Sequence, residues 1–170
     1  MKNDKAECGV PDTCERIVPL WLVLLDNVPT MVMFGMGALL AWLVWRPLGI
    51  LMVLYSFSSI VMFWGFICRH CRHFGTRACP CGYGVLASRY FRRREEGDFR
   101  KIFRKNISLM YPCWFIPLAA GVFLLYTRFS RSLLILFAAF VIVGFILIPA
   151  ISRFVGCKGC TLKDQCPWMN

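Results

Sequence analysis

Cysteine is the residue type that gives this sequence its chemistry, with ten in a chain of 170 residues. One stretch, Cys68-Arg-His-Cys71-Arg-His-Phe-Gly-Thr-Arg-Ala-Cys79-Pro-Cys81, carries four thiols, and a second set closes the sequence. Thiols grouped around C-x-x-C spacings are typical of metal ligands or of redox-active pairs. We therefore take seven cysteines as candidate metal ligands: Cys68, Cys71, Cys79, Cys81, Cys157, Cys160 and Cys166.

Two kinds of metal centre fit this pattern. Zinc sites often use two C-x-x-C pairs; Cys68 and Cys71 form one, whereas Cys79-Pro-Cys81 is tighter than usual. Iron–sulfur clusters also take four thiolates, but their ligands bind different iron atoms and tolerate irregular spacing. We therefore predict an iron–sulfur cluster, with zinc as the alternative. The loop supplies four thiols and the tail three, so one shared site and two separate sites both remain open.

For several residues near these two sets, the sequence leaves two possible roles open. The histidines can ligate zinc or simply add polarity to the loop. The remaining cysteines can complete the tail set or stand apart. Asp26 can lie on a proton path through the membrane or cap a helix, and we favour the cap. The residues left without an assigned role are Cys8, Cys14, Cys113, His70, His73 and Asp26.

The elements that must position these thiols are predicted to be membrane helices. Hydrophobic residues make up 58% of the chain and fall in long blocks, while Asp and Glu number only nine. The blocks predict an all-α integral membrane protein with four transmembrane helices, at 28–45, 48–67, 109–126 and 133–154. Asp26, Asn27 and Pro29 interrupt the first block, so we expect a short interfacial helix at 17–25 before the first span.

Charge predicts the orientation. The net charge is +11, and residues 69–108 hold eleven of the Arg and Lys residues, whereas the opposite turns hold only Arg46, Arg128 and Arg131. By the positive-inside rule, the loop and both termini face the cytoplasm, across a bacterial or archaeal cytoplasmic membrane. Cytosolic thiols stay reduced, which favours metal binding over disulfides. The expected parts are an N-terminal tail (1–16), the interfacial segment with two helices (17–67), the Cys-rich basic loop (68–108), two further helices (109–155) and a Cys-rich tail (156–170).

The basic residues also indicate the partners. Within 85–94 and 98–107 they alternate with apolar residues at helical spacing, which predicts short surface helices lying in the membrane interface. The expected partner is the anionic inner leaflet of the bilayer, with an acidic cytosolic redox protein or membrane oxidoreductase subunits as further possibilities. A nucleic-acid partner is excluded because the positive charge does not spread over a soluble face.

Two family resemblances add expectations. Four helices with cytoplasmic cysteine motifs, including Cys79-Pro80 and Cys166-Pro167, resemble the polytopic ferredoxin-type subunits of bacterial respiratory reductases, which implies iron–sulfur electron transfer. The end of the chain, 157–170, is similar to the end of the Cys-rich domain of protein S-acyltransferases, which implies a reactive thiol at Cys166 before Pro167-Trp168. That family places a histidine directly before its cysteine, whereas Gln165 stands there in this chain.

Together these patterns predict a membrane-embedded metal–thiolate protein, with an iron–sulfur centre that passes electrons between a cytosolic donor and a membrane partner or quinone pool. One alternative is a zinc-stapled membrane scaffold or accessory subunit without a redox role. A second is a thiol enzyme that performs S-acyl transfer or thiol–disulfide exchange.

Overall fold

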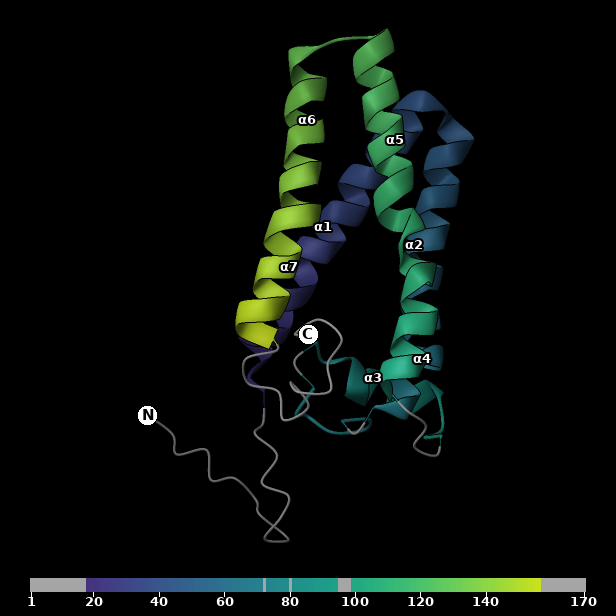
Figure 1. Cartoon of the computed structure of the whole chain (residues 1–170), viewed down its shortest axis with the longest axis vertical. Coiled ribbons are helices and arrows are strands. Elements are labelled where there is room, and N and C mark those ends of the chain that lie inside the picture. The colour runs from purple at the N-terminus through teal and green to yellow at the C-terminus, as the bar shows by residue number, and fades with distance from the viewer. Residues whose placement is uncertain (1–17, 72, 80, 95–98, 157–170) are drawn as a thin grey trace, which may run out of the picture.

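The structure, a computed structural model, describes residues 18–71, 73–79, 81–94 and 99–156 (Figure 1). Within these ranges every regular element is helical, in agreement with the predicted all-α class. In chain order the elements are α1 (Leu20–Val44), α2 (Arg46–Phe66), η1 (Cys68–His70), α3 (Tyr83–Tyr90), α4 (Phe99–Asn106), η2 (Ile107–Met110), α5 (Pro112–Thr127), α6 (Arg131–Val141), η3 (Ile142–Leu147), α7 (Ile148–Ile151) and η4 (Ser152–Gly156).

Within the described residues, four helical segments are long and apolar enough to cross a membrane, in agreement with the predicted number of spans. They are Leu20–Val44, Arg46–His70, Lys101–Thr127 and Arg131–Phe154. Figure 1 shows the turn from α1 to α2 and the turn from α5 to α6 at the same, upper end of the bundle. The elements α3 and α4 lie at the lower end, so the four spans separate a short-loop end from an end rich in thiols and cations.

The first span is one continuous helix, so the predicted break between an interfacial segment at 17–25 and a helix at 28–45 is wrong. Pro29 lies inside α1, and Asp26 does not cap a helix, because the N-cap position of α1 is Pro19. A membrane helix can accept an interior proline when neighbouring polar groups satisfy the backbone. On either side of Pro29, the side chains of Asn27 and Thr30 donate to the carbonyls of Val23 (2.7 Å) and Asp26 (3.3 Å), which lie within the same turns of the helix. The 25-residue helix is about 37 Å long, and it fits a bilayer by running obliquely across the bundle (Figure 1).

The third span begins earlier than predicted. The stretch 98–107 was expected to form a separate surface helix, but α4 continues through η2 into α5, and Figure 1 shows α4 in line with α5. The chain passes Pro112 without a break because a proline in the first turn of a helix needs no N–H partner. The other predicted surface helix, at 85–94, is present as the shorter α3.

The fourth span passes Pro149 without ending, as predicted, and widens into π-helical turns at η3 and η4. In a π-turn the carbonyl of Gly144 would pair with residue 149, which is a proline and has no N–H. The indole Nε1–H of Trp114 donates to that carbonyl instead, over 3.2 Å. This bond satisfies a buried acceptor and ties α5 to the fourth span.

The core of the bundle consists of large side chains where the helices cross, and α1 is central to it. Met33, Leu40 and Phe140 are fully buried. Cys113 of α5 is 1% exposed, and its Sγ lies 3.6 Å from the hydroxyl of Ser59 on α2. The outward faces of the spans carry exposed Leu, Ile, Val and Phe side chains, which are suited to contact with lipid. The serine–cysteine contact therefore lies inside the bundle, among apolar core residues, and the outward faces are apolar as well.

Gly49 offers a test of the packing of α1 on α2. A Cβ at Gly49 would lie 2.6 Å from the Cβ and 2.8 Å from the Cα of Trp42, whereas a Cβ at Gly35 would meet nothing within 4 Å. We expect Gly49→Ala to lower the free energy of unfolding by about 1–3 kcal/mol, because the backbone cannot yield as a side chain can. The measurement is thermal unfolding in detergent micelles.

The matched control is Gly35→Ala, which should leave stability unchanged or raise it slightly through better helix propensity. Equal effects of the two substitutions would contradict the close contact between α1 and α2.

Candidate thiol site at the end of the bundle

The thiol loop begins where α2 ends and is built from tight turns. The N–H of Cys71 donates to the carbonyl of Cys68, and the N–H of Gly82 donates to the carbonyl of Cys79, both over 3.0 Å. Each turn therefore contains one cysteine pair: Cys68 with Cys71, and Cys79 with Cys81. The spacing in the sequence matches this geometry, since each pair sits within a single turn.

Two glycines let the loop fold back on itself and on α1. Gly84 lies so close to the loop that a Cβ there would collide with the carbonyl oxygen of His73. Gly82 has φ +71°, in the left-handed region that favours glycine, and a Cβ there would lie 2.7 Å from Cγ1 of Val23. The second cysteine turn is thus pressed against α1 on one side and the start of the loop on the other.

A side chain of α1 holds this turn from the membrane side. Asn27 donates from Nδ2 to the carbonyl of Cys81 over 3.0 Å. Near the start of α1, the N–H of Val18 donates to the carbonyl of Arg77, also over 3.0 Å. From the sequence alone, Asn27 has no role beyond interrupting the first apolar block, because no local pattern shows which loop a membrane helix will contact. Its position deep in an apolar run was the available signal.

The folded loop brings the four predicted thiols toward one another. Cys68 is buried, whereas Cys71, Cys79 and Cys81 are partly exposed. The charges of Cys79 and Cys71 both act on Cys68, and the thiols of Cys79 and Cys81 are hydrogen-bonded. Residues eleven apart in the sequence, Cys68 and Cys79, therefore share one electrostatic environment.

Cys79 is set up to carry negative charge. The hydrogen bond from the Cys81 thiol lowers the pKa of Cys79 to about 6, and the backbone N–H groups of Gly84, Cys81 and Gly82 act in the same direction against the effect of burial. The same thiol–thiol bond, together with burial and the charge of Asp26, raises the pKa of Cys81. The pair therefore loses its first proton from Cys79.

Asp26 links this pair to two membrane spans. Its carboxylate is hydrogen-bonded to the thiol of Cys81, and Oδ1 accepts a hydrogen bond from the Ser152 hydroxyl over 3.4 Å. Asp26 is thus a neighbour of the thiol site. The cap that we favoured at this position is wrong, and the proton-path alternative remains a hypothesis.

Tyr83, at the start of α3, closes the site on the side of α2. Its ring centroid lies 5.8 Å from that of Trp64 and 6.1 Å from that of Phe63. Burial raises the pKa of Tyr83, and the nearby charges of Cys81, Asp26, Cys68 and Cys79 act in the same direction. The thiol site is therefore bounded by an aromatic cluster at the end of α2.

Other predicted residues lie apart from the loop or outside the described residues. Cys113 lies between α2 and α5, bonded to serines, and is not part of the loop. His70 Nδ1 lies 3.1 Å from the carbonyl of Phe66, and His73 is buried in the loop. Five cysteines fall outside the described residues: Cys8, Cys14, Cys157, Cys160 and Cys166. Over the described ranges, no three Cys, His, Asp or Glu side chains are arranged as a ready set of metal ligands.

In the described residues, the fold and the site together define a helical bundle with four helices apolar enough to cross a membrane and a cysteine-rich loop at one end. Comparisons with protein families, with curated proteins and with solved structures find no match to this chain.

Asn27→Ala tests the contact between α1 and the thiol loop. The substitution removes the Asn27 donor and leaves the partly buried carbonyl of Cys81 without this hydrogen bond. We expect a loss of about 1–2 kcal/mol in the free energy of unfolding and faster labelling of Cys79 and Cys81 by a maleimide. Peptide mass spectrometry after timed labelling measures the second effect.

Thr30→Val serves as the control, because Thr30 bonds only to a carbonyl of its own helix. If labelling of the loop thiols is the same in both variants and in the unmodified protein, α1 does not hold the loop as described.

Proposed function

We propose that this chain is a membrane-anchored metal–thiolate protein whose loop holds an iron–sulfur cluster. The proposed ligands in the described part of the chain are Cys68, Cys71, Cys79 and Cys81. The observation that carries the proposal is the electrostatic coupling of these thiols around Cys79, whose pKa is lowered by the Cys81 thiol and by the backbone N–H groups of Gly84, Cys81 and Gly82.

Hydrogen bonds of this kind favour a metal-bound thiolate. A ligand sulfur carries negative charge, and N–H groups directed at it stabilise that charge without occupying a coordination position. In iron–sulfur proteins such bonds also help to set the reduction potential. Gly82 and Gly84 allow the backbone to approach Cys79 this closely, since a side chain at either position would collide with its surroundings.

The tail cysteines are the second part of the proposed ligand set. Ser152, in the last turn of the fourth span, is bonded to Asp26, and Asp26 is bonded to Cys81. The described chain therefore ends close to the loop, directly before Cys157. We infer that Cys157, Cys160 and Cys166 join the loop thiols in one site or form a second site beside them.

Electron transfer is the role that suits this location. The loop is partly exposed at the end of the bundle and also contacts α1 and α2, so a centre there can reach both an aqueous donor and the membrane. Eleven basic residues in 69–108 support a cytoplasmic position for this end by the positive-inside rule. We propose a cytoplasmic membrane location, with electrons passing from a cytosolic redox protein to a membrane oxidoreductase subunit or quinone.

The proposal predicts iron and acid-labile sulfide in the protein after anaerobic purification, with broad absorption near 400 nm. Cys68→Ser and Cys79→Ser should each remove at least half of the bound iron, because each deletes a loop ligand. Iron and sulfide analysis and the visible spectrum are the measurements.

Cys113→Ser is the control, since Cys113 is buried between α2 and α5 and should not affect metal content. Colourless protein containing about one zinc ion per four thiols would instead support the zinc-stapled scaffold. Protein free of iron, zinc and copper would overturn both forms of the proposal.

A second candidate, thiol–disulfide exchange, is favoured by one observation: Cys79 and Asp26 both lie within hydrogen-bonding reach of the Cys81 thiol. The Cys79 thiolate would attack one sulfur of a substrate disulfide and release the other as a thiolate. The Cys81 sulfur, after losing its proton toward Asp26, would then attack Cys79 in the mixed disulfide. The products are a Cys79–Cys81 disulfide and a fully reduced substrate.

This second candidate predicts that the metal-free protein, with its thiols reduced, reduces the disulfide of oxidised glutathione or of a small disulfide reporter in a stoichiometric reaction. Cys81→Ala should halt the reaction at the mixed disulfide, and Asp26→Asn should slow it by about tenfold or more, in keeping with the loss of a positioned base. Intact mass measured after quenching with iodoacetamide distinguishes the two species. A mixed disulfide that fails to accumulate in Cys81→Ala would exclude this chemistry.

A further inference from the structure

The end of α2 and the end of α3 form a joint surface with exposed apolar side chains. Phe66 on α2 is 48% exposed, and Tyr90 on α3 is 73% exposed. The Tyr90 ring stacks on Trp64, with centroids 6.4 Å apart and an interplanar angle of 16°. The Phe91 ring lies 3.2 Å from the place that a Cβ on Gly65 would take. The end of α3 is therefore fixed against a helix that crosses the membrane.

Cations surround this apolar surface. The chain after α3 is tied to the end of α2, because the N–H of Arg94 donates to the carbonyl of Arg69 over 3.2 Å. On α4, Phe103 is buried and packs edge-on against Phe63, with ring centroids 6.4 Å apart. This contact turns the charged side of α4 outward. We define the basic collar as five exposed residues of these two segments: Arg89, Arg92, Arg94, Arg104 and Lys105.

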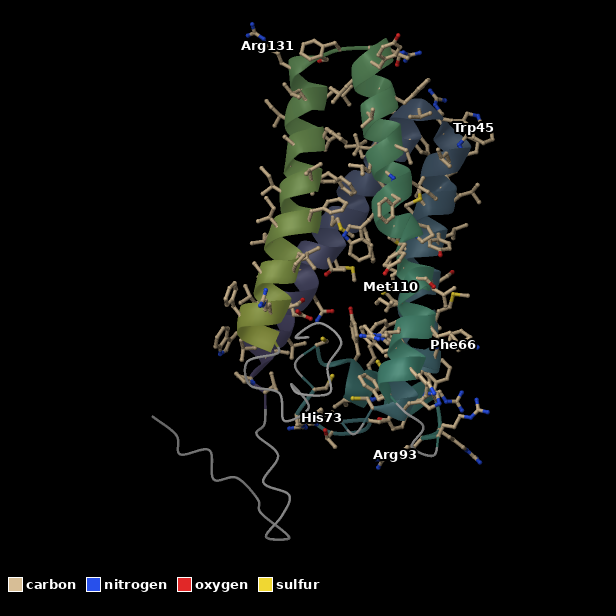
Figure 2. The ribbon with its side chains drawn as sticks, viewed as in Figure 1. Trp45, Phe66, His73, Arg93, Met110 and Arg131 are labelled. Atoms are coloured by element: carbon tan, nitrogen blue, oxygen red, sulfur yellow. The ribbon has the colours of Figure 1, made fainter. Side chains whose placement is uncertain are left out.

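The apolar and charged residues follow one another in the order found across a membrane boundary. Figure 2 places Phe66 beside the lower part of the bundle and Arg93 further out along its long axis. Aromatic side chains favour the interface between hydrocarbon and headgroups, and arginines favour the phosphates just beyond. The collar therefore lies at the depth of the headgroups when α2 spans the bilayer.

We propose that the basic collar binds the phosphate headgroups of anionic lipids, with Tyr90 and Phe66 contacting the adjoining lipid chains. Arginine suits this ligand because its guanidinium can donate two parallel hydrogen bonds to a phosphate. Acidic residues do not cancel the charge: between 89 and 105 the sequence has eight Arg and Lys residues against Glu95, Glu96 and Asp98. This site is independent of any metal at the thiol loop.

An anionic lipid suits this surface better than an acidic soluble protein. A soluble partner would have to cover Tyr90 and Phe66, which are continuous with the lipid-facing side of α2. A lipid satisfies both parts of the surface at once, with its phosphate on the arginines and its chains on the aromatic rings. The apolar part of the surface thus decides between the two partners.

The test uses the full-length protein in dodecyl maltoside and two probes, dioleoylphosphatidylglycerol and dioleoylphosphatidylcholine. Native mass spectrometry counts the retained lipids. We expect phosphatidylglycerol to be retained preferentially, and Arg89→Gln/Arg92→Gln to weaken its affinity roughly 25-fold, since each cation near an anionic surface contributes about fivefold. Arg128→Gln/Arg131→Gln, at the opposite end of the bundle, is the matched control and should bind as the unmodified protein does.

Arg89→Lys/Arg92→Lys guards against a folding defect, because it keeps the charge and should retain most of the preference. The proposal is wrong if the unmodified protein retains both lipids equally, or if the control variant loses as much affinity as the collar variant. It is also wrong if the preference is absent and polyglutamate binds the protein in phosphatidylcholine nanodiscs through Arg89 and Arg92. That last result would make the collar a docking surface for an acidic protein.

Discussion

The contact between α1 and the second cysteine turn is the constraint on which the lower end of the structure depends. Asn27 bonds to the carbonyl of Cys81, and Val23 packs where any side chain at Gly82 would lie. A membrane helix is a rigid support, since all of its backbone bonds are internal and lipid provides no competing donors. The loop thus gains a fixed position that a solvent-exposed loop of the same sequence would lack.

This arrangement also explains why polar residues are tolerated within an apolar helix. Asp26 and Asn27 interrupt the hydrophobic run of α1, and in hydrocarbon each would be costly. Both instead face partners inside the protein: Asn27 contacts Val23 and Cys81, and Asp26 contacts Cys81 and Ser152. The continuous helix is therefore compatible with its polar pair, because that pair lies where the loop and the fourth span meet α1.

The thiol loop shows how backbone geometry can stabilise the negatively charged thiolate form of a cysteine. The Cys81 thiol lowers the pKa of Cys79, and the backbone N–H groups that the close approach at Gly84 and the left-handed turn at Gly82 bring near it act in the same direction, while the pKa of Cys81 rises. A negative sulfur stabilised in this way suits the proposed cluster and also the alternative exchange chemistry. The two differ in whether the other thiols bind the same metal or remain free to react.

The sequence by itself determined the class of protein and the residues of interest. Long apolar blocks have one stable arrangement in lipid, so the four spans follow from composition, and the cysteine spacing alone marked the turns at Cys68 and Cys79. Only the tertiary structure decided that α1 is unbroken, that α4 continues into α5, and that Asp26 and Asn27 lie beside Cys81. The position of Asn27 beside Cys81 depends on a contact between residues more than fifty apart in the sequence, and the local sequence around Pro29 carries no information about such a contact.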